Sequence, residues 1–172
     1  TDSSSDAKSY VAIRIIVHDQ LSRAEQILSE MTLEEKVGQM FMVRCPDSDA
    51  ADKVSAYHLG GYILFAQDFA DKNAGDVRHM IQSYQANAAI PLLIGVDEEG
   101  GTVNRISINP NLRNEPFYSS QELFQEGGYD LIYNDTKEKC GFLRSLGINV
   151  NFAPVCDVST DPNDYIYKRS FG

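Results

Sequence analysis

Short apolar runs alternate with segments of helical periodicity along this chain, and this alternation constrains the fold more than any other feature. The run at residues 92–96 is continuously apolar, which is typical of a strand buried on both faces of a parallel sheet. Strands that alternate with helices are joined by right-handed crossovers. We therefore predict an α/β fold with the order strand, helix, strand, helix, strand, helix, strand.

The expected elements follow from periodicity and capping residues. Strands are predicted at residues 39–44, 62–65, 92–96 and 148–152. Helices are predicted at residues 20–31, from 32 to 37, at 49–59, at 71–88 and from about 130 to 146. Thr32 and Glu35 have the spacing of a capping box, and Gly147 is placed to end the last helix. Residues 104–121 read as a loop, and residues 10–17 fit either a strand or a helix.

Composition limits the classes of partner. The formal net charge is -10, from 25 acidic and 15 basic residues, which disfavours nucleic acid and anionic membrane surfaces but is compatible with a neutral sugar. No apolar run is long enough to cross a membrane, since Arg14 interrupts the early one. Cys45, Cys140 and Cys156 show no metal-ligand spacing with the histidines, so we expect buried thiols rather than a disulfide, and no metal.

The amino-terminal segment differs from the rest of the chain. Residues 1–19 are interpreted as a tail or linker that begins polar and Ser-rich, and residues 20–172 as a single α/β unit. Such a tail fits a secreted or cell-envelope protein, with a lipid anchor as an option. A cytoplasmic location is the alternative.

A group of charged residues follows the strand at residues 92–96. Asp97 stands where the strand ends, and in parallel β/α folds ligands bind at that end. Gly100 and Gly101 allow a tight turn, from which Arg105 can return toward Asp97. The structural alternatives are a turn cap for Asp97 and a surface ion pair of Arg105 with Glu98 or Glu99. For Asp68 we favour a helix cap over a place in the site.

Two motifs carry a resemblance to a known family. Val96, Asp97, Glu99, Gly100, Gly101, Val103 and Arg105 fill a pattern that resembles the signature of family 3 glycoside hydrolases, in particular the β-N-acetylglucosaminidase branch. Residues 147–158, Gly-Ile-Asn-Val-Asn-Phe-Ala-Pro-Val-Cys-Asp-Val, and the Arg-Ser-Phe-Gly of residues 169–172 are similar to a second motif of the family. The resemblance implies a TIM-type (β/α)8 barrel, of which this chain covers about the amino-terminal half.

The resemblance also implies roles for individual residues. Asp97, Arg105 and Arg169 would hold the terminal sugar, because carboxylates and guanidinium groups hydrogen-bond vicinal hydroxyls in paired geometry. Glu99, Gly100 and Gly101 would order the turn. Asp157, expected in an apolar setting, would brace the loop that carries Arg169.

The implied activity is exo-acting, retaining hydrolysis of terminal N-acetylglucosamine from cell-wall or chitin-type oligosaccharides, without a cofactor. In this branch a late-strand aspartate is the nucleophile, and a histidine of a Lys-His-x-Pro-Gly-His-Gly segment is the proton donor. This sequence contains no such segment, so no catalytic residue is expected within it, and both groups are expected beyond Gly172. The 172-residue chain alone is then expected to be inactive and poorly stable.

Two alternatives stay open. The first is a β-glucosidase of the same family. The second is a non-catalytic α/β module that binds a carbohydrate or another small ligand, in a doubly wound domain with Asp97 at the point where the strand order reverses.

Overall fold

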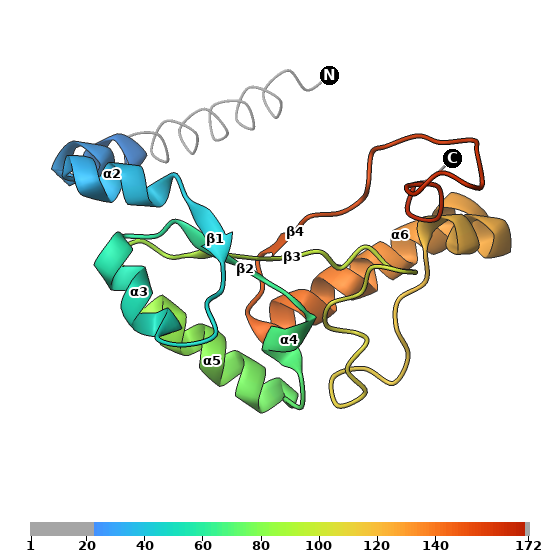
Figure 1. The fold of residues 1–172 in the computed structure, drawn as a ribbon, viewed down its shortest axis with the longest axis horizontal. Helices are drawn as coiled ribbons and strands as arrows, with labels where there is room; N and C mark the ends of the chain where they lie inside the picture. The colour runs from blue at the N-terminus through green and yellow to red at the C-terminus, as the bar shows by residue number, and fades with distance from the viewer. Residues whose placement is uncertain (1–22, 171–172) are drawn as a thin grey trace, which may run out of the picture.

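A four-stranded parallel sheet forms the centre of the computed structural model, which describes residues 23–170 (Figure 1). The strands are β1 (Met42–Arg44), β2 (Gly61–Leu64), β3 (Leu93–Val96) and β4 (Val150–Asn151), in the spatial order β1-β2-β3-β4. All three neighbouring pairs are parallel, so the four carboxyl ends lie at one edge. The predicted strand order is confirmed. The predictions for residues 1–22 lie outside the described residues.

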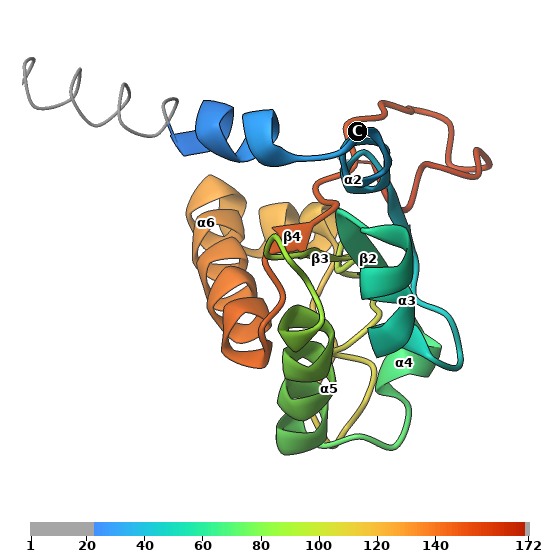
Figure 2. The same cartoon turned by 90° about the vertical axis from the view of Figure 1, so that its left-hand side faces the viewer.

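Helices connect the strands and cover one face of the sheet. Residues 23–30 are helical, and α2 (Leu33–Gln39), α3 (Ala50–Tyr57), α4 (Ala66–Phe69), α5 (Ala74–Ala86) and α6 (Ser120–Leu146) follow. Figure 2 shows α3, α5 and α6 around the same side of the sheet. Crossovers that place helices on one side are what a barrel-type winding requires.

Local capping explains where several helices begin. Thr32 and Glu35 bond each other's backbone N–H groups at the start of α2, which confirms the predicted capping box. Asn73 accepts hydrogen bonds from Gly75 and Asp76 at the start of α5. At the other end, Gly147 closes α6 with a φ of 95°, a conformation that favours glycine.

The two faces of the sheet differ in burial. The core lies between the sheet and the helices, and its fully buried side chains include those of Tyr62, Leu64, Ile94 and Val96. Leu93 contradicts the prediction that residues 92–96 are buried on both faces, because 52% of its surface is exposed. Leu93 lies on the opposite face with Phe152, which is 45% exposed, and the described residues place no helix layer over that face.

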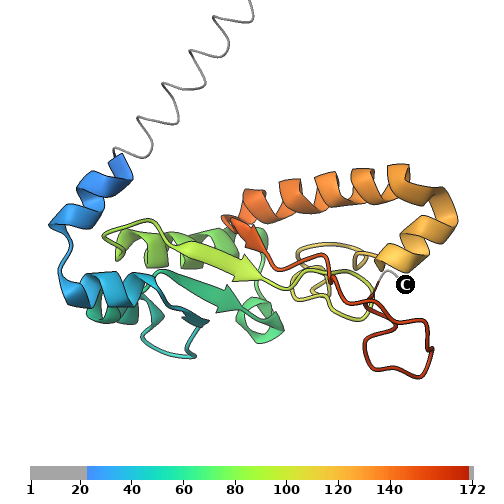
Figure 3. The same cartoon turned by 90° about the horizontal axis from the view of Figure 1, so that it is seen from above.

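Helix α6 begins earlier than predicted. A capping box of Ser119 and Glu122 starts it at Ser120, ten residues before the expected position. Gly127 and Gly128 have non-helical backbone angles and divide it into two parts. Figure 3 shows this bend and the last described segment lying beside the first part. The glycine pair hides the helical pattern of residues 120–126 in the sequence.

Two predictions from composition can also be compared with the structure. All three cysteines are free, but Cys140 and Cys156 are exposed, so the expectation of buried thiols is right only for Cys45. Cys140 is exposed because it falls on the outer side of α6. In the part of the chain from residue 23 to 170, no helix combines the length and apolar character needed to span a membrane.

Candidate functional site

Asp97 and Arg105 meet at the carboxyl edge of the sheet. Asp97 directly follows β3, and its Oδ2 lies 3.7 Å from an Nη2 of Arg105. The side chains are 22% and 29% exposed, so the pair is open to a ligand on one side. The guanidinium carbon of Arg105 lies 5.5 Å from the ring centre of Phe65, which follows β2. The predicted return of Arg105 toward Asp97 is confirmed, and neither Glu98 nor Glu99 is its ionic partner.

Glu98 binds the backbone of residues 105–107, the segment that includes Arg105. Its side chain is fully buried, and its carboxylate accepts hydrogen bonds from the backbone N–H groups of Arg105 and Ile106 at 2.8 Å and of Ser107 at 3.2 Å. The Ser107 hydroxyl donates a further hydrogen bond to it. A buried carboxylate is tolerated when N–H groups surround it in this way. Glu98 therefore fixes the loop that returns Arg105 to Asp97.

Glu99 forms an ion pair with Arg169, which lies near the carboxyl-terminal end of the described residues. Arg169 donates through Nε to Oε2 at 3.0 Å and through Nη2 to Oε1 at 2.8 Å, which is the paired geometry of a strong ion pair. This hydrogen bonding raises the pKa of Arg169 above its usual value. Three consecutive carboxylates thus have three different partners: an arginine side chain, a loop backbone and a second arginine.

Gly100 and Gly101 form the turn that separates these partners. Their φ angles are 101° and 63°, which favour glycine. A Cβ on Gly100 would lie 2.1 Å from the carbonyl oxygen of Tyr118, and one on Gly101 would lie 2.7 Å from the Cβ of Ser119. The turn is closed by backbone hydrogen bonds between Gly100 and Val103. Both glycines are needed because the segment before α6 passes directly against the turn.

Lys139 of α6 contacts the backbone of the same turn. Its side chain is only 8% exposed, and its Nζ donates a 3.1 Å hydrogen bond to the carbonyl oxygen of Glu99. The same ammonium lies 3.2 Å from Oδ2 of Asp135, one helical turn earlier, and 5.0 Å from the ring centre of Phe117. A carboxylate, a carbonyl and an aromatic face together compensate the buried positive charge.

Two asparagines attach the strand β4 region to β3. Asn149 accepts from the N–H of Ile94 and donates to the carbonyl of Leu92, and Asn151 bonds both the N–H and the carbonyl of Glu98. These amides add to the backbone hydrogen bonds from Asn149 to Ile94 and from Phe152 to Val96, which lie at the two ends of a two-residue strand. They hold Glu98, and with it Asp97 and Glu99, at the edge of the sheet.

The structure does not give every predicted residue a role. Asp157 is exposed, and within residues 23–170 no hydrogen bond or ion pair joins it to Arg169 or to another side chain. The expected apolar setting for Asp157 is wrong, because the segment after β4 runs along the surface. Asp68 lies inside α4, a short helix that was not predicted, and its carboxylate accepts from the N–H of Phe65 at the start of that helix. The capping role is thus found in α4 and not at the helix expected from residue 71, and burial raises the pKa of the Asp68 carboxyl.

Sequence reasoning missed Glu98 and Lys139 as organising residues. Lys139 and Asp135 lie four residues apart and fall on the stripe of α6 that includes Leu143 and Leu146, both buried. Opposite charges on an otherwise apolar stripe were a usable signal. No comparable sequence pattern marks Glu98, because most of its partners are backbone groups.

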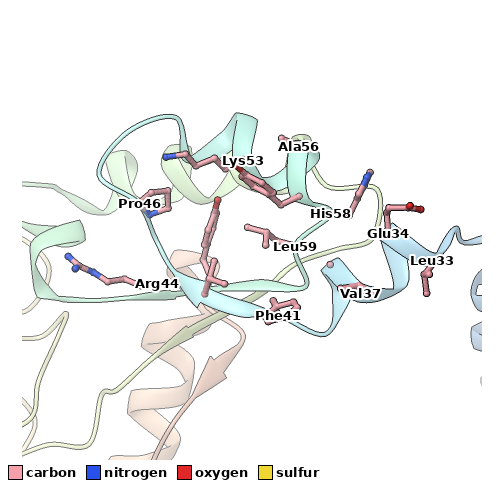
Figure 4. Close-up of a pocket in the computed structure, with 14 residues that line it drawn as sticks. Leu33, Glu34, Val37, Phe41, Arg44, Pro46, Lys53, Ala56, His58 and Leu59 are labelled. Atoms are coloured by element: carbon pink, nitrogen blue, oxygen red, sulfur yellow. The ribbon is translucent and has the colours of Figure 1, made fainter.

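An apolar groove lies outside the group formed by Asp97, Glu98, Glu99 and their partners. It has a volume of about 810 Å³ and is bordered by α2, β1 and α3. Figure 4 shows Val37, Phe41 and Leu59 along it, with Arg44 and Lys53 toward one end. Its lining includes neither Asp97 nor Arg169. The groove is thus separate from the charged site.

A parallel sheet wound with outer helices, with its charged site at the carboxyl edge, is a TIM-barrel-type α/β fold. Residues 32–172 match the family model described as the glycosyl hydrolase family 3 N terminal domain, and the chain belongs to that family.

Relatives and solved structures agree with this assignment. The chain is 31% identical over 140 residues to the β-hexosaminidase LpqI of Mycobacterium tuberculosis, covering 80% of this chain and 34% of LpqI. It is 28% identical over 158 residues to a β-N-acetylglucosaminidase/β-glucosidase of Cellulomonas fimi, covering 90% of this chain and 26% of that protein. The structure of a family 3 β-N-acetylglucosaminidase from Paenibacillus sp. str. FPU-7 superimposes with a TM-score of 0.71 at 33% identity, covering 83% and 28% of the two chains. The chain therefore spans between about a quarter and a third of the length of these relatives.

Proposed function

We propose that the full-length protein containing this chain is an exo-acting, retaining β-N-acetylglucosaminidase, and that this part of it holds the terminal sugar. The arrangement of Asp97 with Arg105 at the carboxyl edge of the sheet carries the proposal. A carboxylate that accepts and a guanidinium that donates offer complementary groups to neighbouring sugar hydroxyls. Because the pair is partly exposed, a ligand can reach it without unfolding the turn.

The second ion pair contributes a further arginine. Arg169 is held by Glu99 through two hydrogen bonds and lies over the ring of Tyr165, and its side chain is 25% exposed, so part of the guanidinium can face a ligand. In the proposed site Asp97, Arg105 and Arg169 contact the sugar, whereas Glu99, Gly100 and Gly101 keep them in place. Asp97, Arg105 and Arg169 are joined through the short segment of residues 97–105, which favours recognition of a single sugar ring rather than of an extended chain.

Bond cleavage requires groups that this part of the protein does not supply. Retaining hydrolysis needs a carboxylate nucleophile and a proton donor on opposite sides of the scissile bond. We assign neither role to the carboxylates described above, because Glu98 and Glu99 are engaged with the backbone of residues 105–107 and with Arg169. Asp97 is assigned to binding, and no metal or cofactor takes part in the proposed reaction.

The test compares two chromogenic substrates on the full-length protein. We expect hydrolysis of a 4-nitrophenyl N-acetyl-β-glucosaminide to exceed that of the matching β-glucoside. The reverse preference would support the β-glucosidase alternative, an activity that the name of the Cellulomonas fimi relative includes beside N-acetylglucosaminidase. Sugar binding without turnover of either substrate would support the non-catalytic module.

The cellular location belongs to the same proposal. The polar, Ser-rich segment at residues 1–9 fits a secreted or envelope-attached protein that acts on cell-wall or chitin-type oligosaccharides. Fractionation of the producing cells tests this, since recovery of the protein in the cytoplasm alone would contradict it.

A further inference from the structure

We propose that Lys139, together with Asp135, is a positioning residue that sets the Glu99–Arg169 ion pair for sugar binding. The proposal rests on the function proposed above, because it assigns Arg169 to the sugar. It concerns a helix that contributes no side chain to the sugar itself. Its basis is the contact between the Lys139 ammonium and the backbone of the residue that holds Arg169.

The hydrogen bond from Lys139 to Glu99 lies where it can set the direction of the Glu99 side chain. Lys139 donates to the carbonyl oxygen of Glu99, immediately before the two glycines whose backbone angles set the turn. The side chain of Glu99 in turn holds Arg169 at 2.8 Å and 3.0 Å. A carbonyl fixed in this way fixes the direction in which the Glu99 side chain leaves the backbone. Loss of the ammonium would leave the Glu99 carbonyl without this donor, next to two glycines whose backbone resists rotation less than that of other residues.

The local environment argues against a merely solvated lysine. The side chains of Lys139 and Asp135 are 8% and 11% exposed, so both charges have left water. A buried ion pair contributes little net stability compared with apolar side chains of similar size. The pair therefore stabilises the fold no better than two apolar residues would, whereas its hydrogen bond to Glu99 has a direct effect on the site.

The decisive variant removes both charges together. In Lys139→Met with Asp135→Leu no unpaired buried charge remains, so we expect an unfolding midpoint close to that of the unmodified protein. The hydrogen bond to Glu99 is lost, so KM for the N-acetylglucosaminide should rise about tenfold with kcat little changed. Lys137→Met is the matched control, because Lys137 is an exposed lysine on the same helix.

A comparison in the Arg169→Ala background distinguishes a positioning role of Lys139 from a general loss of structure. In an Arg169→Ala background the double charge removal should have no further effect on KM, since the group that it positions is already absent. Independent, additive losses would overturn the proposal. An unchanged KM in the Lys139→Met, Asp135→Leu variant would also overturn it.

A second measurement does not depend on the substrate. The Nε–H of Arg169 is bonded to Glu99, so its hydrogen exchange can be followed by ¹⁵N nuclear magnetic resonance of the full-length protein. We expect faster exchange in the variant than in the Lys137→Met control. If the unmodified protein hydrolyses neither glycoside but the exchange is faster, the proposed function fails and the positioning role stands. Unchanged exchange would overturn the positioning role whatever the substrate.

Discussion

The turn after β3 and the groove beside β1 lie at different places on one sheet and are built in opposite ways. In the turn, the carboxylates of Asp97, Glu98 and Glu99 each have a defined partner. The groove is lined by apolar side chains that are exposed, such as Leu33 at 73% and Phe41 at 53%. The turn is thus specified by its own polar contacts, whereas much of the groove is apolar surface that the described residues leave uncovered.

The turn and the groove therefore depend on two different sources of stability, hydrogen bonds in one and burial of apolar surface in the other. A polar network fixes its own geometry, because each hydrogen bond holds one group relative to another and burial strengthens the bonds. Apolar surface gains stability only when something covers it. Changes in the turn should therefore have large and specific effects, and changes in the groove should have small ones.

The largest effect is expected from Glu98→Ala. Removing the buried carboxylate leaves three backbone N–H groups without their acceptor, and leaves the Ser107 hydroxyl with only Oδ1 of Asn104 at 3.0 Å. We expect the free energy of unfolding to fall by about 4 kcal/mol, from several unsatisfied donors at once. Urea denaturation followed by circular dichroism measures this. Glu126→Ala, at an exposed position of α6, is the control, and equal stabilities for the two variants would show that the turn is not held by Glu98.

Asp97→Ala should have the next largest effect, on activity rather than stability. Loss of a charged hydrogen-bonding group from the proposed sugar site should lower kcat/KM by the equivalent of about 3 kcal/mol. Steady-state kinetics with the chromogenic N-acetylglucosaminide measure it on the full-length protein. Asp130→Ala removes an exposed carboxylate of α6 for comparison. Kinetics like those of the unmodified protein would remove Asp97 from the site.

A smaller effect is expected in the groove. The 172-residue chain should increase the fluorescence of a hydrophobic dye, because the groove exposes apolar surface. Replacing Val37 and Phe41 by serine should lower this increase by about half. Tyr165→Ser is the control, since Tyr165 is 85% exposed but does not line the groove. An undiminished increase in the doubly substituted chain would place the dye, and the uncovered surface, elsewhere.

The smallest effect concerns thiol reactivity. Cys140 and Cys156 are exposed, whereas Cys45 is buried and lies 3.5 Å from the Tyr84 hydroxyl. Burial raises the pKa of the Cys45 thiol, so less of the reactive thiolate is present at any given pH. At pH 8 we expect two thiols to react rapidly with an aromatic disulfide reagent and the third to react only after denaturation. Three rapid reactions would contradict the packing around β1.

The parts of the structure that sequence reasoning predicted are local. The capping box of Thr32 and Glu35 could be read directly, because its two partners are three residues apart. The strand before Asp97 could also be predicted, since its apolar run begins after Pro91 and ends at Asp97. The same capping pattern at Ser119 and Glu122 was missed, because the glycines at 127 and 128 interrupt the helix soon afterward.

The parts that sequence reasoning did not predict depend on backbone groups and distant partners. Glu98 bonds N–H groups whose directions are set only when the loop closes. The partner of Glu99 lies 70 residues away, and only the family resemblance placed Arg169 in the site. Leu93 was expected to be buried, and its exposure depends on what covers the other face of the sheet, which the periodicity of one strand does not reveal.

The bend in α6 has a consequence for how the ion pair is maintained. The first part of the helix carries Gln121, whose amide donates to the carbonyls of Tyr167 and Ser170 on either side of Arg169. The second part carries Lys139, which grips the backbone of Glu99. The two parts of a single helix thus hold the two partners of the ion pair through separate hydrogen bonds to their backbone. The bend at Gly127 and Gly128 sets how far apart these two sets of contacts lie.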